Sequence, residues 1–278
     1  MSRFCFVILK TFRPCSLPLQ SFFRAMSITT PWASLPQDFL YKLMPGNVHV
    51  WGVPLDDSPE RASRYRAYLS ADELTRADRC RTPHPQYQFV ITRAILRMLL
   101  SRYMKVRPAQ LQFETQPKGK PALITASSFP IQFNVSHTRG MALIALTTQH
   151  AIGIDVEWID RNVQAHDIAE RYFSARESQY LASLSPPERT HQFFSYWTCK
   201  EAYLKMQGRG IAEGLAQCEL TMNPDQMQVW LTHVDQQGQG EDYSLYQITS
   251  GSAHVGAVAI ACTSAQISYW NWEEKYLL

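Results

Sequence analysis

The sequence predicts an α+β protein built from two similar α/β halves. Helix-like and strand-like periodicities alternate along residues 48–262, with no low-complexity segment among them. The second half repeats the plan of the first, and the alanine-rich strands expected at 141–147 and 255–261 look like counterparts. The sequence similarity between the halves is weak, so a duplication is only suggested. At 278 residues and 45% hydrophobic, the chain can bury a large core as one large domain or two small ones.

The first half is expected to contain a strand, a long helix and then a three-strand meander: residues 48–53, 86–103, and 129–135, 141–147 and 151–158. The helix is indicated by apolar residues that recur on one face, and the strands by short runs of β-branched and apolar residues. Ser136 and His137 are expected at the first turn of the meander.

The second half is expected to begin with two helices and to end with four strands: residues 167–183 and 186–207, then 217–222, 227–233, 243–249 and 254–262. The helix at 186–207 has clear boundaries. Ser185 is placed as its N-cap, Pro186 as its first residue and Glu188 as the capping-box partner, while Gly208 is placed to end it.

Two pairs of charged residues lie in segments that otherwise favour burial. Asp155 and Glu157 are two apart in an apolar strand, so they point to the same face. Glu201 and Lys205 fall together at i,i+4 spacing on the margin of the apolar stripe of their helix. Each pair could also be an ordinary solvent-exposed pair. Together, three carboxylates aimed at one point predict an oxygen-rich site for a hard cation, and Mg²⁺ suits it because it also takes phosphate oxygens as ligands.

These segments resemble the paired signature of the 4′-phosphopantetheinyl transferases. The resemblance rests on Ile152-Gly153-Ile154-Asp155 and on Trp197-Thr198-Cys199-Lys200-Glu201-Ala202-Tyr203-Leu204-Lys205. Two further segments agree with the larger, Sfp-type branch, namely Pro117-Lys118-Gly119-Lys120-Pro121 and Phe133-Asn134-Val135-Ser136-His137. The resemblance covers residues 45–262 and implies two α/β halves packed around one active site at their junction.

The resemblance implies transfer of the 4′-phosphopantetheine arm of coenzyme A to a serine of an apo acyl or peptidyl carrier protein, with release of adenosine 3′,5′-bisphosphate. It implies that Asp155, Glu157 and Glu201 bind Mg²⁺. Glu201 is then also the candidate base, directly or through a metal-bound water, and Lys205 stabilises or protonates the departing phosphate. The catalytic set is Glu201, Lys205 and His137, although a histidine at a strand end is more often structural.

A basic region precedes these motifs, and arginine suits phosphate recognition. The resemblance assigns nine residues to coenzyme A: Arg76, Arg79, Arg93, Lys120, Pro121, Ser136, His137, Lys200 and Lys205. Gln86 and Gln88 stand where relatives often carry basic residues, which leaves the details of the pocket open. Arg97 and Arg102 are interpreted as residues of a solvated helix face.

The expected organisation is an N-terminal extension at residues 1–40, a coenzyme A-binding half at 41–150 and a metal-binding, catalytic half at 151–278. Residues 1–37 lack Asp and Glu, which is typical of a transit peptide, but Met26 offers an alternative start, so we interpret the first 25 residues as dispensable. No apolar run approaches the ~20 residues that span a bilayer. The six cysteines are scattered and form no Cys-x-x-Cys pair, which argues against a zinc site or a redox pair. Such single cysteines favour a reducing compartment, which we expect to be the cytoplasm.

We therefore expect a cytoplasmic monomer that binds neither nucleic acid nor a membrane. Two other functions stay open. A Mg²⁺-dependent phosphoesterase acting on coenzyme A or a related nucleotide would use a similar carboxylate cluster. A catalytically dead carrier-binding module would have no chemical reason to keep three carboxylates and Lys205 near a core. The carrier that the protein serves is not encoded in any motif that we find.

Overall fold

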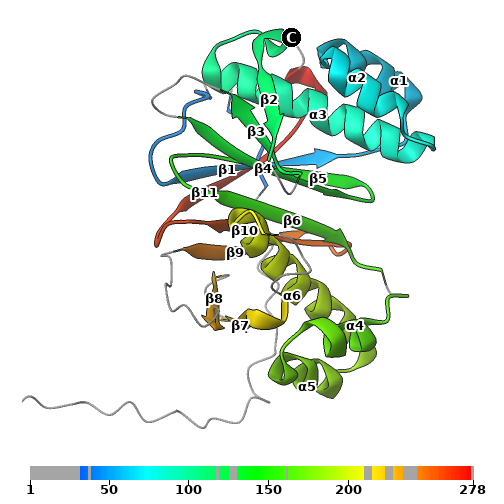
Figure 1. Ribbon diagram of the computed structural model, residues 1–278, viewed down its shortest axis with the longest axis vertical. Helices are drawn as coiled ribbons and strands as arrows, with labels where there is room; N and C mark the ends of the chain where they lie inside the picture. Colours follow the sequence, from blue (N-terminus) through cyan, green and yellow to red (C-terminus); the bar gives the residue numbers. More distant parts are fainter. Residues whose placement is uncertain are drawn as a thin grey trace, which may run out of the picture.

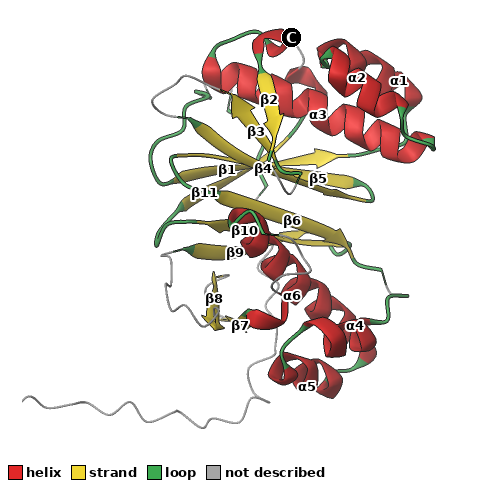
Figure 2. Cartoon of the chain, viewed as in Figure 1, coloured by secondary structure: helices red, strands yellow, loops and turns green. Residues whose placement is uncertain are grey.

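A computed structural model describes residues 32–36, 39–116, 119–124, 130–160, 162–209, 215–222, 228–233 and 243–276. Figure 1 shows two sheets lying face to face, with one group of helices above the first sheet and a second group below the other. The same view coloured by secondary structure shows that the helices lie on the two outer sides, with the strands between them (Figure 2). The α+β class and the two-half plan are thus confirmed.

The first sheet has the strand order β11-β1-β5-β4. Its strands are β1 (Asn47–Pro54), β4 (Ile131–Thr138), β5 (Met141–Thr148) and β11 (Gln266–Asn271). The covering helices are α1 (Pro59–Tyr65), α2 (Ala71–Asp78) and α3 (Pro83–Met104), with the short turns η2 (Arg66–Tyr68) and η3 (Pro108–Gln110). A two-stranded sheet, β2 (Gln112–Thr115) and β3 (Pro121–Ile124), lies beside α3.

The second sheet has the strand order β6-β10-β9-β8-β7. Its strands are β6 (Ile152–Trp158), β7 (Glu219–Met222), β8 (Gln228–His233), β9 (Ser244–Ser250) and β10 (His254–Ile260). Its helices are α4 (Ala165–Tyr172), α5 (Ala175–Ser183) and α6 (Pro186–Met206), with the short turn η5 (Leu215–Gln217). The last short turn, η6 (Glu274–Tyr276), belongs to the first half, because Tyr276 packs in the core beside α3. After β10 the chain returns to the first sheet, where β11 pairs in parallel with β1.

Three hydrophobic cores correspond to the interfaces between these layers. One lies between α3 and the first sheet, and another between α6 and the second sheet. The third lies between the two sheets and includes Val50, Leu143, Ile154 and Val258, which are fully buried. Strands with both faces buried read as continuous apolar runs, which is why β5 and β10 look alike in the sequence.

The sequence prediction of a three-strand meander is wrong. β4 and β5 are antiparallel neighbours, but β6 leaves the first sheet and pairs with β10. Strand propensity is the same in either sheet, so the pattern could not reveal the change of partner. Ser136 and His137 also lie within β4 and not at its turn, which is formed by Arg139 and Gly140.

Two smaller predictions are also corrected. The expected helix at 167–183 is two helices, because Ser174 caps α5 through a capping box with Glu177 and interrupts the run. Arg97 and Arg102 are not on a solvated face. Arg97 is 2% exposed and donates to Glu73, while Arg102 donates from Nη1 to the Tyr41 hydroxyl at 2.6 Å. The two guanidinium groups can leave water because acceptors distant in the sequence, Glu73 and Tyr41, form hydrogen bonds with them.

Residues 32–36 are part of the fold. Trp32 donates from Nε1 to the carbonyl of Thr249 at 3.2 Å, and Ala33 forms a bridge with Trp270 of β11. A chain starting at Met26 would keep these contacts, whereas one starting after residue 40 would lose them. The remaining expectations for residues 1–31 fall outside the described residues. Within the described part of the chain, no helix is long and apolar enough to cross a membrane.

Candidate active site at the junction of the two halves

Alternate side chains of β4 join the first sheet to the edge of the second. Asn134 accepts a hydrogen bond through Oδ1 from the backbone N–H of Ile154 at 2.8 Å, in a buried position. Thr138 accepts through Oγ1 from the N–H of Trp158 at 3.2 Å. Ser136 lies between them on the same face of β4, because side chains alternate along a strand. The two halves are therefore connected side by side along β4 and β6.

Ser136 meets the first predicted carboxylate. Its Oγ donates to Oδ1 of Asp155 at 2.8 Å, and Nζ of Lys205 donates to the same oxygen at 2.6 Å. Nζ of Lys205 also lies 3.3 Å from the Ser136 hydroxyl. Asp155 is 3% exposed, so its charge is stabilised by these two donors in place of water. The structure thus brings together one residue from each of β4, β6 and α6.

Gly153 allows α6 to lie directly against β6. A Cβ at this position would be 2.0 Å from the carbonyl oxygen of Ala202 and 2.4 Å from the backbone nitrogen of Met206. Because only glycine permits this approach, the helix backbone reaches the strand and its inward side chains face Asp155. Glu201 accordingly is only 4% exposed, as its position on the apolar margin predicted.

The three carboxylates interact electrostatically. Burial and then the negative charge of Asp155 raise the pKa of Glu157 to about 7, against an opposing effect of Lys205. The pKa of Glu201 is also raised to about 7, by burial, by Asp155 and by Glu157, again opposed by Lys205. Ionised carboxylates that share a site repel one another, and binding either a proton or a cation lowers the free energy of the site.

The site was tested for its fit to a metal ion. Among the described residues, no group of three or more His, Cys, Asp or Glu side chains is placed so that it could hold one. However, Oδ2 of Asp155 and Oε1 of Glu201 are buried and have no hydrogen-bond partner among the described residues. Carboxylate oxygens are the ligands that Mg²⁺ prefers, so the chemistry of the donors fits that ion.

His137 and two predicted phosphate ligands lie at the same end of the first half. His137 is exposed at the end of β4, and its pKa is lowered by desolvation and then by the positive charges of Lys205, Arg76 and His84. Arg76 is exposed on α2, with its guanidinium 4.9 Å from the centre of the Phe89 ring. Arg79 is exposed just beyond the same helix. His137 therefore lies close enough to Arg76 of α2 and to Lys205 of the carboxylate cluster to feel both charges.

Arg93 on α3 is half-buried beside Glu73. Its Nε lies 3.5 Å from Glu73 Oε1, while the same carboxylate accepts from Arg97 at 2.6 Å. Nη1 of Arg93 is buried without a hydrogen-bond partner among the described residues. Burial lowers the pKa of Arg93. An unpaired guanidinium N–H of this kind is a suitable donor for a phosphate oxygen.

Lys120 contacts the second half through its ammonium group. Nζ donates to the backbone carbonyls of Ile152 at 2.8 Å and Lys205 at 3.1 Å, and burial lowers its pKa to about 8. Pro121 follows as the first residue of β3. In this structure Lys120 therefore connects the loop before β3 to the start of β6 and the end of α6.

Lys200 is not brought to the carboxylate cluster. It is fully buried, and its Nζ donates to Glu177 Oε2 at 2.7 Å and to the carbonyls of Leu215 and Cys218. Successive helix residues point about 100° apart, so Lys200 faces α5 when Glu201 faces β6. A role in binding coenzyme A is therefore not proposed for Lys200, and the prediction from the resemblance is corrected.

Sequence reasoning missed the residues that hold the halves together. Asn134 and Thr138 belong to neither charged pair, and only their spacing of two on either side of Ser136 could have signalled a shared face. Gly153 was noted only as part of a motif. Its position inside an apolar strand is the signal, since glycine there often marks a close backbone approach.

Two family models match this chain. Residues 57–149 match the model described as 4′-phosphopantetheinyl transferase, N-terminal, and residues 151–262 match that of the 4′-phosphopantetheinyl transferase superfamily. The boundary between the two matches falls directly before β6, the strand that carries Asp155 and Glu157.

Curated relatives agree with the family models. The 4′-phosphopantetheinyl transferase HetI of Nostoc sp. is 35% identical over 239 residues, which are 86% of this chain and 98% of that protein. The 4′-phosphopantetheinyl transferase psf-1 of Bacillus pumilus is 31% identical over 62% of this chain and 72% of its own. The 4′-phosphopantetheinyl transferase Sfp of Bacillus subtilis is 25% identical over 63% of this chain and 77% of its own.

The fold and the matches therefore define a transferase of two α/β halves with charged residues gathered at their junction. The chain belongs to the 4′-phosphopantetheinyl transferase superfamily, and it is an enzyme of that activity.

Proposed function

We propose that this enzyme transfers the 4′-phosphopantetheine arm of coenzyme A to a serine of an apo acyl or peptidyl carrier protein, in a Mg²⁺-dependent reaction. The serine oxygen forms a bond to the phosphorus that carries pantetheine, the phosphoanhydride bond breaks, and adenosine 3′,5′-bisphosphate leaves. The observation that carries the proposal is the buried cluster of Asp155, Glu201 and Lys205 at the junction of the halves.

Asp155, Glu157 and Glu201 would hold the Mg²⁺ ion. The two carboxylate oxygens without partners, Asp155 Oδ2 and Glu201 Oε1, support this assignment. When bound, Mg²⁺ neutralises negative charge on the phosphate groups. Ser136 fixes the other oxygen of Asp155, and so sets the direction in which its carboxylate points.

Glu201 is the proposed base for the carrier serine. In the absence of the ion, burial and the charge of Asp155 raise its pKa to about 7, so this carboxylate has a higher proton affinity than an ordinary glutamate. The proton of the serine hydroxyl passes to the Glu201 carboxylate as the new phosphorus–oxygen bond forms. Lys205, whose ammonium group lies at the cluster, would stabilise the departing phosphate or give it a proton.

We assign coenzyme A mainly to the first half, residues 41–150, and metal binding and catalysis to residues 151–278. Arg76, Arg79 and Arg93 would bind its phosphates, and the unpaired Nη1 of Arg93 supports this role. The further proposed contacts are Lys120, Pro121, Ser136, His137 and Lys205. We propose that a single chain builds the site, because both sides of the junction come from the same protomer.

The decisive experiment incubates the purified enzyme with coenzyme A, Mg²⁺ and a panel of apo carrier proteins, followed by mass spectrometry. We expect a carrier to gain the mass of one phosphopantetheine and adenosine 3′,5′-bisphosphate to appear in equal amount. Removal of Mg²⁺ by a chelator should stop the reaction, and added Mg²⁺ should restore it. Cleavage of coenzyme A without any modified carrier would instead identify a phosphoesterase.

A further inference from the structure

A second pocket lies far from the carboxylate cluster. It encloses about 720 Å³, a volume typical of small-molecule sites, between the segment before β1, the end of α3 and the ends of β4 and β5. Its lining residues from the strands are Ile131 and Thr148, which pair with each other. Ser136 lies five residues further along β4, so about 17 Å of strand separates the pocket from the proposed active site.

The pocket combines an apolar wall with positive charge. Its apolar and aromatic lining is Phe39, Leu40, Tyr41, Leu43, Tyr103, Met104 and Ile131. The charged residues that line it are Lys42, Arg102 and Lys105, and none of its described lining residues is Asp or Glu. Leu40 is 77% exposed, so its side chain is accessible at the mouth of the pocket.

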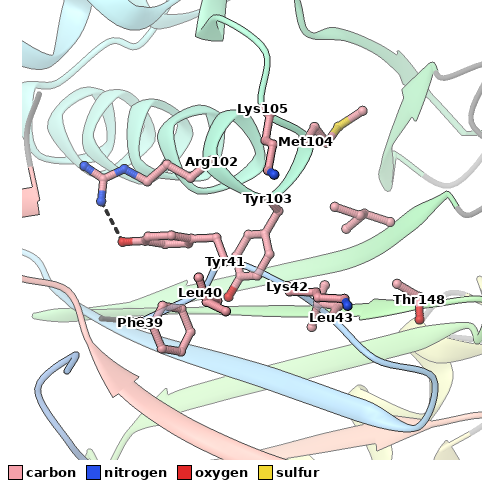
Figure 3. A pocket seen from close by; sticks show the side chains of 11 residues that line it. Phe39, Leu40, Tyr41, Lys42, Leu43, Arg102, Tyr103, Met104, Lys105 and Thr148 are labelled. Atoms are coloured by element: carbon pink, nitrogen blue, oxygen red, sulfur yellow. Dashed lines mark hydrogen bonds between the residues drawn. The ribbon is translucent and has the colours of Figure 1, made fainter. Parts of the chain in front are cut away.

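Two of the three cations are available to a ligand. The guanidinium group of Arg102 already has partners within the protein. It donates to the Tyr41 hydroxyl, a bond drawn in Figure 3, and to the carbonyl of Tyr276. Lys42 and Lys105 are both exposed, and neither forms an ion pair among the described residues. In Figure 3 they come from opposite walls, Lys105 from the end of α3 and Lys42 from the segment before β1.

A buried polar group in the lining gives independent support. The side chain of Thr148 is part of a residue that is only 7% exposed, and its Oγ1 has no hydrogen-bond partner among the described residues. A buried hydroxyl without a partner is unfavourable unless a ligand or water satisfies it. The pocket therefore has one hydrogen-bonding group without a partner and two ammonium groups without an ion pair, counting the described residues alone.

From these features we propose that this pocket binds an amphipathic anion, which has an apolar body and a carboxylate or phosphate head. The apolar body would lie against Leu40, Met104 and Ile131, and the head would lie near Lys42 and Lys105. Segment 39–43 precedes the region matched by either family model, whereas the other lining residues lie within the N-terminal match. The pocket shares no described lining residue with the carboxylate cluster. A cationic amphiphile would be repelled by Lys42, Arg102 and Lys105, because none of the described lining residues is a carboxylate.

The proposal is tested by isothermal titration calorimetry of the full-length enzyme with decanoate and with decyl phosphate, each below its micelle-forming concentration. The comparison of the two shows which head group is preferred. Decyltrimethylammonium, which has the same chain and the opposite charge, is the ligand control. We expect binding of at least one anion and no binding of the cation.

The variant Lys42→Glu/Lys105→Glu should weaken anion binding about tenfold or more, because two attractive charges become repulsive. Arg107→Glu is the matched control: it is an exposed basic residue two positions from Lys105 that does not line the pocket, and it should change affinity less than twofold. Unchanged transferase activity in both variants would show that they are folded. The proposal would be overturned if neither anion binds, or if decanoate and the cation bind equally. It would also be overturned if the two variants have equal effects on affinity.

Discussion

A Cβ atom on Gly153 would lie 2.0 Å from the carbonyl oxygen of Ala202, so the contact between β6 and α6 depends on the absence of a side chain at one position. This contact places Glu201 and Lys205 opposite Asp155. It also explains why a glycine stands two residues before Asp155, a proposed metal ligand. The geometry of the site therefore follows from a backbone contact between two elements that are far apart in the chain.

Gly153→Ala should destabilise the protein by about 1–3 kcal/mol or more, because neither backbone atom in the contact can move without shifting α6. Gly52→Ala is the control, since its Cβ would meet only the side chain of Trp32 at 2.9 Å, and a side chain can adjust. Chemical denaturation measures both. If the two variants lose equal stability, the close approach of α6 is not what Gly153 provides.

Asn134→Leu should lower the free energy of unfolding by about 1–3 kcal/mol, since the buried N–H of Ile154 loses its acceptor. Thr138→Val removes the equivalent bond to Trp158, which is longer and only part-buried, so its effect should be smaller. Denaturant unfolding gives both values. A larger effect of Thr138→Val would mean that Asn134 is not the principal connection between the halves.

Stabilisation by Mg²⁺ should depend on pH. The pKa of Glu201 is raised to about 7 from an ordinary value of 4.5, so the folded protein binds more protons than the unfolded chain between these values. Without metal, this group's contribution to stability is complete below pH 4.5 and is lost as the pH rises through 7. Because Mg²⁺ binds the ionised carboxylates, its thermal shift should be larger at pH 8 than at pH 5.5. An equal shift at both pH values would exclude these carboxylates as the ligands.

Glu201→Gln should lower turnover about 100-fold or more, because the amide keeps the shape of the side chain but cannot accept the serine proton. Glu170→Gln, an exposed residue of α4, is the control and should leave turnover unchanged. Steady-state transfer to an apo carrier measures both. Normal turnover of the Glu201 variant across the pH range would exclude Glu201 as the base.

Arg76→Ala and Arg79→Ala should each raise KM for coenzyme A about tenfold, because each removes one charge-assisted contact with a phosphate. KM for the carrier should change little. Arg64→Ala, on the exposed side of α1, is the control. An equal rise of both KM values would argue that these arginines bind the carrier instead.

Lys200→Met should destabilise the protein by about 3–5 kcal/mol, since it leaves the buried carboxylate of Glu177 without its cation. The double variant Lys200→Met/Glu177→Gln should recover part of this loss. The Lys200→Met protein that remains folded should have an unchanged KM for coenzyme A. A selective rise in KM with normal stability would restore Lys200 to the coenzyme A site.

Local patterns in the sequence predict the class of the fold, the long helix α6 with both of its boundaries, and the inward direction of Glu201. These features depend on interactions within a few residues, such as the capping box of Ser185 with Glu188 and the left-handed Gly208 that ends the helix. They can be recognised in a linear pattern, because the partners lie within one or two helical turns of each other.

Long-range contacts decide which sheet each strand joins, where the buried cations lie, and how the two halves connect. β6 and β11 have ordinary strand patterns, yet each joins a different sheet from the strand that precedes it in sequence. Lys200 and Glu201 are adjacent in the motif but lie on different sides of α6, so only one of them reaches the carboxylate cluster. Contacts of this kind join residues far apart in the chain, and propensity and periodicity carry no information about such partners.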